Sequence, residues 1–494
     1  MMQKLYPLFV MIPLGTAFSI IFFPRRLAWI VEIIVTTVIA ALVIMALTLI
    51  GYSPFSYYVG NWAPPYGITL VSDSISTLLL LIINIVGFLS ILYAFRYMDM
   101  FTSKVRFYTL YLLMMAGLNG VVITGDLFNL FVFLEIATIA SYALVGFGCE
   151  HEELEASFKY TILGSVSSAL ILLGIAIIYS VSGTLNMADI AIFISTHGLN
   201  KAILFAEALF LMGFGLKGAM VPFHAWLPDA HPAAPAPISA MLSGVVIKAC
   251  GVYVLIRIFY HIVGLTYLTH LIFMSMGLLS MVVGVLLAVG QWDFKRLLAY
   301  HSISQMGYVM VGIGLGTPLG ILGGLFHLMN HAFFKSLLFL CAGAIEYSTG
   351  TRNLKEMGGL FKKMPITSTM CSIASLSISG VPPFNGFWSK LIIIIALVQA
   401  KYYAIAAITA AVSFLTLVSF IKVQRYALFG KLPEKFAAIK EVPYLMSGAL
   451  VILALLCISI GMLYPFFGNT VLVMARDAVL DQQKFIKLIF PSAY

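Results

Sequence analysis

The sequence has few charged residues and no closely spaced pair of cysteines. Only 10% of its 494 residues are charged, whereas 62% are hydrophobic. This balance excludes an ordinary soluble domain and favours a membrane protein with many spans. The cysteines stand singly in apolar stretches, so neither a disulfide framework nor an iron–sulfur site is indicated: Cys149, Cys250, Cys341, Cys371 and Cys457.

The chain also lacks a nucleotide-binding loop, a set of metal-cluster ligands and a redox-cofactor motif. It has no basic tail or patch interleaved with aromatics, so its net charge of +9 does not indicate nucleic-acid binding. We therefore expect no cofactor and no metal in this chain. Whether the chain works within an enzyme is left open.

Long hydrophobic runs predict about fourteen transmembrane helices of roughly 20 residues each. The N-terminal run lacks a clear small-residue cleavage site, so it is interpreted as the first helix and not as a signal peptide. The predicted spans lie near residues 5–22, 27–50, 72–95, 106–123, 127–148, 157–181, 201–226, 237–259, 264–289, 295–316, 318–345, 366–399, 403–429 and 445–466.

Positive charges divide unequally between the loops. When the loops are numbered alternately, the odd-numbered loops collect 17 Lys and Arg residues and the other side, which includes both termini, collects seven. The positive-inside rule assigns the richer side to the cytoplasm and places both termini outside. This asymmetry explains the net positive charge and supports the number of spans.

Four lysines fall inside predicted spans: Lys217, Lys248, Lys335 and Lys390. A charged lysine at the bilayer centre costs about 2.5–3.5 kcal/mol on insertion scales. These side chains must therefore face the interior of the bundle, have partners, or be partly neutral. The alternative is that they extend to the membrane surface from a helix end, and Lys335 fits that alternative best.

One carboxylate, Glu135, lies near the middle of a predicted span. An ionisable residue within the membrane is a candidate functional site by default. Glu135 and Lys217 would neutralise each other if their spans are neighbours. The alternative is a structural hydrogen bond from Glu135 to an adjacent helix.

His327, His331 and Lys335 are spaced four residues apart in FHLMNHAFFKSLLFL. On a helix this spacing places all three on one stripe. Two histidines at this spacing can hold zinc, but no carboxylate stands between them and Lys335 would repel a cation. Because imidazole titrates near neutral pH, a proton relay is favoured over zinc and over a structural polar stripe.

Prolines interrupt two of the predicted spans. GAMVPFHAWLP contains Pro222 and His224, and SGVPPFNGFWSK contains Pro382 and Pro383; in both stretches Pro-Phe is followed shortly by Trp. Paired broken helices point to an internal repeat and an ion pathway, since backbone groups freed within lipid must line a wet cavity or be buried in protein. A simple proline kink is the alternative at each position.

Five stretches resemble the signatures of the antiporter-like membrane subunits found in respiratory complex I, Mrp-type cation/proton antiporters and membrane-bound hydrogenases. The resemblance covers roughly residues 60 to 430. The stretches are TGDLFNLFVFLEI, LKGAMVPFHAWLPDAHPAAPAPISAMLSGVVIKACGVYVLIR, DFKRLLAYHSISQMGYV, FHLMNHAFFKSLLF and SGVPPFNGFW.

The resemblance implies fourteen helices in a prokaryotic cell membrane, with helices 7 and 12 broken. Two inverted five-helix repeats would occupy residues 106–260 and 261–430, between N-terminal helices at 1–105 and a last helix and tail at 431–494. Family residues carried over by motif suggest a proton path through Glu135, Lys217, Lys248, His327, His331 and Lys390, with Lys335 and His224 as further candidates.

The last position of this path separates members of the family. Some members have glutamate there, whereas this chain has Lys390, which is similar to the Mrp D-type pattern. The resemblance therefore favours the D-type member of an Mrp antiporter, which moves protons, with transport of Na⁺ left open. Its partners would be other hydrophobic subunits.

Three other functions are alternatives to the antiporter. The chain could be the ion-pumping subunit of a redox-driven complex, of the membrane-bound hydrogenase or NADH:quinone oxidoreductase type, with iron–sulfur and metal-site subunits as partners. A stand-alone transporter of organic solutes is disfavoured by the line of Lys, Glu and His. A purely structural scaffold is disfavoured by the four lysines within spans.

Overall fold

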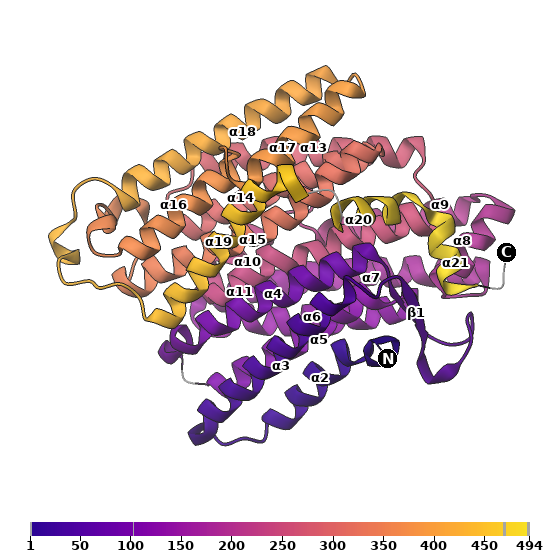
Figure 1. The fold of residues 1–494 in the computed structure, drawn as a ribbon, viewed down its shortest axis with the longest axis horizontal. Coiled ribbons are helices and arrows are strands. Elements are labelled where there is room, and N and C mark those ends of the chain that lie inside the picture. Colours follow the sequence, from indigo (N-terminus) through magenta and orange to yellow (C-terminus); the bar gives the residue numbers. More distant parts are fainter. Residues whose placement is uncertain (1, 102, 468–470, 492–494) are drawn as a thin grey trace.

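A computed structural model describes residues 2–101, 103–467 and 471–491 of the chain. Long helices lie side by side in one bundle (Figure 1). The α-helices are α1 (Met2–Leu5), α2 (Leu8–Ile20), α3 (Ala28–Leu49), α4 (Ser74–Tyr97), α5 (Lys104–Ile123), α6 (Leu127–Val145), α7 (His151–Ser182), α8 (Met187–His197), α9 (Lys201–Lys217), α10 (Leu227–Ala233), α11 (Ala236–Met241), α12 (Val254–Ile256), α13 (Tyr267–Val289), α14 (Phe294–Gly314), α15 (Pro318–Thr349), α16 (Pro365–Ser379), α17 (Asn385–Gln399), α18 (Tyr403–Val423), α19 (Tyr444–Phe467), α20 (Val471–Leu480) and α21 (Gln482–Ile489).

Shorter elements complete the fold. The π-helical segments are η4 (Leu242–Val246), η5 (Lys248–Tyr253), η6 (Arg257–Ile262) and η9 (Gln424–Leu428). The 3₁₀ turns are η1 (Arg25–Leu27), η2 (Val59–Asn61), η3 (Met98–Met100), η7 (Leu354–Glu356), η8 (Leu360–Lys362) and η10 (Glu434–Phe436), and the strands are β1 (Phe55–Tyr58) and β2 (Thr69–Ser72).

Polar residues mark where the apolar helices begin and end. Asp73 accepts a hydrogen bond from the Ser76 backbone N–H at 2.9 Å and so caps the start of α4. Asp293 caps α14 in the same way through Arg296 at 2.8 Å. The long helices α7 and α15 end at Gly183 and Gly350, whose positive φ angles of 72° and 70° suit glycine.

The predicted spans overlap the observed helices, with three differences. α7 begins at His151 and not near residue 157, α9 ends at Lys217 and not near residue 226, and the span predicted at 366–399 is divided into α16 and α17. Among the described residues, ten helices are long and apolar enough to cross a membrane. The other four predicted spans correspond to shorter or more polar elements: α2 with 13 residues, α9 with 17, the polar α14, and α16 and α17 with 15 each. The helical membrane fold is thus confirmed.

One end of the bundle contains elements that the sequence did not indicate. β1 and β2 form an antiparallel hairpin with Phe55 opposite Ser72, so the chain is not purely helical. This hairpin lies near α8, α21 and the N-terminus (Figure 1). The Tyr58 hydroxyl donates to the Ile489 carbonyl at 2.9 Å, which joins the hairpin to the last helix.

The core of the bundle consists of α15 and the irregular segment from Ala236 to Ile262. The most apolar window of that segment is 100% buried and that of α15 is 94% buried, whereas the corresponding value for α3 with its preceding turn is 28%. Lysine and histidine side chains on these two central elements are therefore shielded from lipid by the rest of the protein.

Candidate ion-translocation site

The first helix break separates α9 from α10. α9 ends at Lys217 and α10 begins at Leu227, so Lys217 is the last residue of a helix and not the middle of a span. Pro222 lies in the connecting loop. The Trp226 indole donates to the Leu216 carbonyl at 2.9 Å and satisfies one acceptor of the broken helix end.

Lys217 lies beside Glu135, the arrangement that the sequence allows if their two spans are neighbours. Its Nζ is 3.5 Å from Glu135 Oε1, and the side chains are 2% and 25% exposed. Ser168 connects the two charges, because its hydroxyl accepts from Lys217 at 3.1 Å and donates to Glu135 at 2.5 Å. Lys217 also donates to the Tyr142 hydroxyl at 3.1 Å. The ammonium group therefore has a counter-charge and polar partners within the protein.

Aromatic packing links this ion pair to the helix break. Tyr142 meets Tyr160 edge to face at 4.5 Å, and Tyr160 stacks on Trp226 at 4.2 Å. The Tyr142 hydroxyl occupies the space above Gly164, where it would clash with an added Cβ. A movement of the break would consequently shift Tyr142 and change its hydrogen bond with the ammonium group of Lys217.

Lys248 lies in η5 and is completely buried. Its Nζ donates to the Ser243 carbonyl at 2.6 Å, and the Ser243 hydroxyl lies 2.7 Å from that of Ser302. No carboxylate within residues 2–101, 103–467 and 471–491 forms an ion pair with it. η5 packs directly on the first break, since a Cβ on Gly251 would lie 2.5 Å from Gly218 Cα.

The predicted stripe of His327, His331 and Lys335 lies on α15. The two imidazole rings are nearly parallel, with centroids 6.4 Å apart. His327 contacts Ser389 at 2.9 Å and Gln305 at 3.1 Å. In the described part of the chain, both ring nitrogens of His331 and Nζ of Lys335 have no hydrogen-bond partner. Because Lys335 is completely buried, it does not extend to the membrane surface.

The second helix break lies between Ser379, where α16 ends, and Asn385, where α17 begins. Pro382 and Pro383 occupy the exposed connection. Lys390 Nζ donates to the Ile378 carbonyl at 2.7 Å, and so caps the broken end of α16, and to the Ser413 hydroxyl at 3.2 Å. It also lies 4.8 Å from the centroid of the Tyr308 ring. These partners are all uncharged.

The structure does not bring every predicted residue into this line. His224 lies half-buried in the first break, and no hydrogen bond within the described residues joins its Nδ1 to the others. Sequence reasoning missed the uncharged partners of the lysines and histidines, because serine, tyrosine and glutamine give no charge signal in an apolar span: Tyr142, Ser168, Ser243, Gln305, Ser389 and Ser413.

Metal binding has no support in the part of the chain that the structure describes. No group of three or more His, Cys, Asp or Glu residues is arranged there to hold a metal ion. Of the two histidines on α15, His327 has serine and glutamine as partners.

Two broken helices and a series of buried lysines and histidines place this chain among the polytopic membrane proteins that have ionisable groups in the interior of the helix bundle. Residues 124–416 match the family described as NADH:quinone oxidoreductase/Mrp antiporter, transmembrane region. The chain belongs to this family and is a multi-pass membrane protein, as the resemblance predicted.

Similar proteins and solved structures extend this finding. The chain is 41% identical over 376 residues to the D-type subunit of the Na(+)/H(+) antiporter of Alkalihalophilus pseudofirmus, covering 75% of this chain and 76% of that one. Its fold is similar to a chain of the Mrp complex from a Dietzia species, with a TM-score of 0.90, 27% identity and 99% of both chains covered. It is also similar to a chain of the archaeal membrane-bound sulfane sulfur reductase, with a TM-score of 0.89, 32% identity and coverage of 98% and 100%.

Proposed function

We propose that the chain is the D-type, proton-translocating subunit of an Mrp-type cation/proton antiporter. The observation that carries this proposal is the Glu135–Lys217 pair, 3.5 Å apart and directly before a helix break. Similarity to the D-type antiporter subunit of Alkalihalophilus pseudofirmus supports it. The partners would be other hydrophobic subunits of one complex in the cell membrane, and the cargo would be protons, with Na⁺ carried by the complex.

We further infer fourteen crossings arranged as two inverted five-helix repeats. Ten spanning helices, together with α2, the interrupted pairs α9–α10 and α16–α17, and the polar α14, give this number. The repeats would comprise residues 106–260 and 261–430, with 1–105 before them and 431–494 after them. Each repeat then contains one break, and each break has a lysine beside it.

The first step of the proposed mechanism is the loosening of the Glu135–Lys217 pair. The Glu135 side chain is 25% exposed, so an adjacent subunit can reach it. A charge or movement there would draw Glu135 away from Lys217. An ammonium without its counter-charge in a low-dielectric site holds its proton less strongly, so Lys217 would release the proton.

The released proton would pass from Lys217 to Lys248, along His327 and His331, and on to Lys390, with Lys335 as a side branch of the same line. Each charge moved against 100 mV costs about 2.3 kcal/mol. The chain carries no motif for a nucleotide or redox cofactor, so a counter-flowing ion or a redox partner must supply this energy.

A second candidate is the pumping subunit of a redox-driven complex. The observation that favours it is the 32% identity, over nearly the full length of both chains, to a chain of an archaeal respiratory membrane complex. Purification of the native complex in mild detergent, followed by mass spectrometry of its subunits, separates the candidates. Small hydrophobic companions alone support the antiporter, whereas iron–sulfur and metal-site subunits support the redox machine.

Replacement of Glu135 tests the mechanism that both candidates share. We expect Glu135→Gln to abolish coupled proton transport in vesicles that contain the assembled complex, because Lys217 would lose the carboxylate that balances its charge. Glu356→Gln is the matched control, since Glu356 is 46% exposed and pairs with Lys435 outside the bundle core. Full transport by Glu135→Gln would refute the scheme.

A further inference from the structure

Another pair of lysine and glutamate with a buried ammonium lies at one end of the bundle. Lys295 Nζ is 2.7 Å from Glu346 Oε2, and the side chains are 3% and 26% exposed. Lys295 lies in the first turn of α14, at the edge of the bundle, yet its side chain is buried beside a carboxylate. This pair therefore resembles Glu135–Lys217 in having a shielded lysine and a more accessible glutamate.

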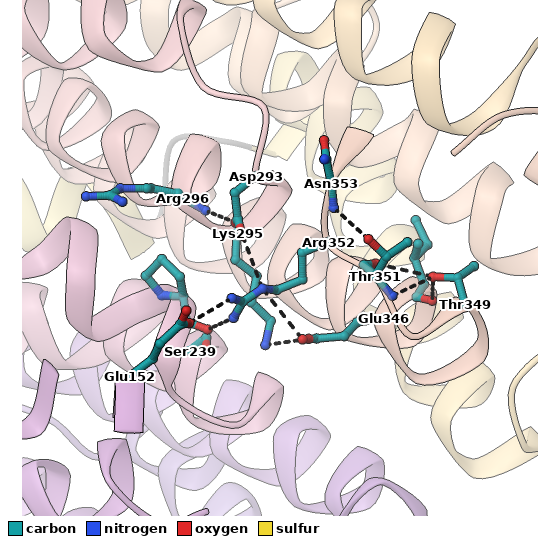
Figure 2. Close-up of polar contacts among 12 residues, drawn as sticks. Glu152, Ser239, Asp293, Lys295, Arg296, Glu346, Thr349, Thr351, Arg352 and Asn353 are labelled. Atoms are coloured by element: carbon teal, nitrogen blue, oxygen red, sulfur yellow. Dashed lines mark hydrogen bonds and ion pairs between the residues drawn. The ribbon is translucent and has the colours of Figure 1, made fainter. Parts of the chain in front are cut away.

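Arg352 lies beside Glu346, among further carboxylates (Figure 2). Its Nε lies 3.1 Å from Asp293 and 3.7 Å from Glu346, and one terminal nitrogen is 3.4 Å from Glu152. Burial opposes the charge of Arg352, but the surrounding carboxylates outweigh it and raise the pKa of the guanidinium. Two open cavities of about 450 and 610 Å³ adjoin these residues, and the larger one is lined by Glu346. Water can thus reach the glutamate.

Polar contacts continue from Lys295 toward the interior. Lys295 also donates to the Ala234 carbonyl at 3.4 Å. The Ser239 hydroxyl lies 3.0 Å from that same carbonyl oxygen and 2.7 Å from the carbonyl oxygen of His231. The buried lysine and the backbone that carries His231 are therefore parts of one hydrogen-bonded assembly.

His231 is a fully buried histidine for which the proposed mechanism has no role. Its side chain is 0% exposed, and both ring nitrogens lack a hydrogen-bond partner among the described residues. A buried polar group without a partner is costly and calls for an explanation. Simple packing against Phe339 and Trp226, at 5.5 and 6.1 Å between ring centroids, would be served better by an apolar ring.

Phe339 also contacts Lys335, whose Nζ lies 5.6 Å from the ring centroid and has no hydrogen-bond partner within the described part of the chain. Lys335, Phe339 and Glu346 are successively four and seven residues apart on α15, so they share one face of the helix. About 16 Å of helix separates Lys335 from Glu346. Between them α15 touches α11 closely, since a Cβ on Gly343 would clash with the Ala236 Cβ.

We propose that the Lys295–Glu346 pair is the site where protons from water gain access to the second half of the protein, and that His231 carries them to Lys335. The proposal rests on the proposed function, because it supplies the lysines and histidines of that path. Glu346 takes a proton from a hydronium ion in the cavity and thereby loosens Lys295. Lys295 then gives one of its ammonium protons to a ring nitrogen of His231 and is reprotonated by Glu346, while His231 releases the proton on its other ring nitrogen to the neutral amine of Lys335.

Transport by the assembled complex in vesicles tests this proposal. Because positioned proton carriers contribute factors of about 100 or more, we expect Glu346→Gln and His231→Phe each to lower proton transport at least about tenfold. Arg296→Gln is the matched control: it removes a cation that pairs with Asp229 at the same surface, and transport should stay near the wild-type rate. Wild-type transport by either test variant, with Glu135→Gln inactive, overturns this inference and leaves the proposed function intact.

Thiol labelling gives a second readout that does not depend on transport. In a Cys149→Ser background, which removes an exposed native thiol, Glu346→Cys should react with a membrane-impermeant maleimide added on the side that carries Arg352. His231→Cys should be protected at rest and become reactive when Lys295→Met is added. A protected thiol at position 346, or an equally reactive thiol at position 231 with and without Lys295→Met, refutes the access site.

Discussion

The two helix breaks stabilise their lysines in different ways. At the first break, Lys217 has a carboxylate 3.5 Å away, connected through Ser168. At the second break, Lys390 has a backbone carbonyl and the Ser413 hydroxyl as acceptors, all of them uncharged. The lysine at the first break thus has a negative charge beside it, whereas the lysine at the second break has neutral acceptors.

This difference gives the proposed path a direction. A compensated ammonium is suited to hold a proton until its partner moves, whereas an ammonium held only by neutral acceptors is suited to pass the proton on. Both halves carry a lysine at a break, so the number of lysines does not distinguish them. The two halves differ because, among the described residues, only the first break has a carboxylate, that of Glu135, beside its lysine.

The strongest test gives the second half a carboxylate as well. Ser413 lies 3.2 Å from Lys390 Nζ, so Ser413→Asp would place a negative charge beside the ammonium. If the new pair favours the protonated lysine by roughly 3 kcal/mol, proton transport should fall about 100-fold. The measurement is proton flux in vesicles that contain the assembled complex.

Ser413→Asn is the control for that change, because it has nearly the same shape as the aspartate without its charge. We expect the asparagine variant to retain most of its transport. Equal fluxes in the two variants would mean that the charge beside Lys390 does not matter, and the contrast between the two breaks would then have no functional meaning.

A smaller effect is expected when the bridge within the first half is removed. Ser168→Ala deletes the hydroxyl that contacts both Lys217 and Glu135. Hydrogen bonds to charged groups contribute about 1.5–3 kcal/mol, and at the lower end of that range, which suits a partly exposed carboxylate, a loss of about tenfold in transport is expected. Ser165→Ala, on the exposed side of α7 with a hydrogen bond to the Thr161 carbonyl, is the matched control. Similar rates for both alanine variants would contradict the bridging role.

The sequence predicted the helical fold from its long apolar runs, and it predicted that the lysines within those runs face the protein interior because charged residues are rare and costly in membranes. Lys217, Lys248, Lys335 and Lys390 stand out in apolar spans, and the structure buries each of them. Pro222 and Pro383 identified the two breaks for a similar reason, since proline removes a backbone donor from a helix.

Features that depend on packing between distant segments could not be predicted. Lys295 lies at the start of a predicted span, where a charge is common. Its burial depends on Glu346, which is 51 positions away in the sequence. His231 gave no signal, since its missing hydrogen bonds are apparent only once its neighbours are known. The hairpin of β1 and β2 was hidden by its short strands of four residues each.

The smallest expected effect concerns how each break is held in place. Trp226 donates to Leu216 within its own break and is 1% exposed, whereas the half-buried Trp388 donates at 2.8 Å to Gly461 of α19. After Trp226→Phe the Leu216 carbonyl keeps the Ala219 backbone N–H as a donor at 3.0 Å, so the loss should cost about 1 kcal/mol. Gly461 lies four residues before Pro465, which has no N–H to donate, so Trp388→Phe leaves the Gly461 carbonyl without a helix donor and should cost about 1–3 kcal/mol.

Thermal unfolding midpoints of the purified complexes would measure this difference. Since the two substitutions are chemically identical, the lower midpoint expected for Trp388→Phe reports the Gly461 carbonyl left without a helix donor and not the loss of an indole as such. A lower midpoint for Trp226→Phe would instead mean that the stacking of Trp226 on Tyr160 limits the stability of the bundle. In that case the first break would depend on its own tryptophan more than the second break depends on its contact with α19.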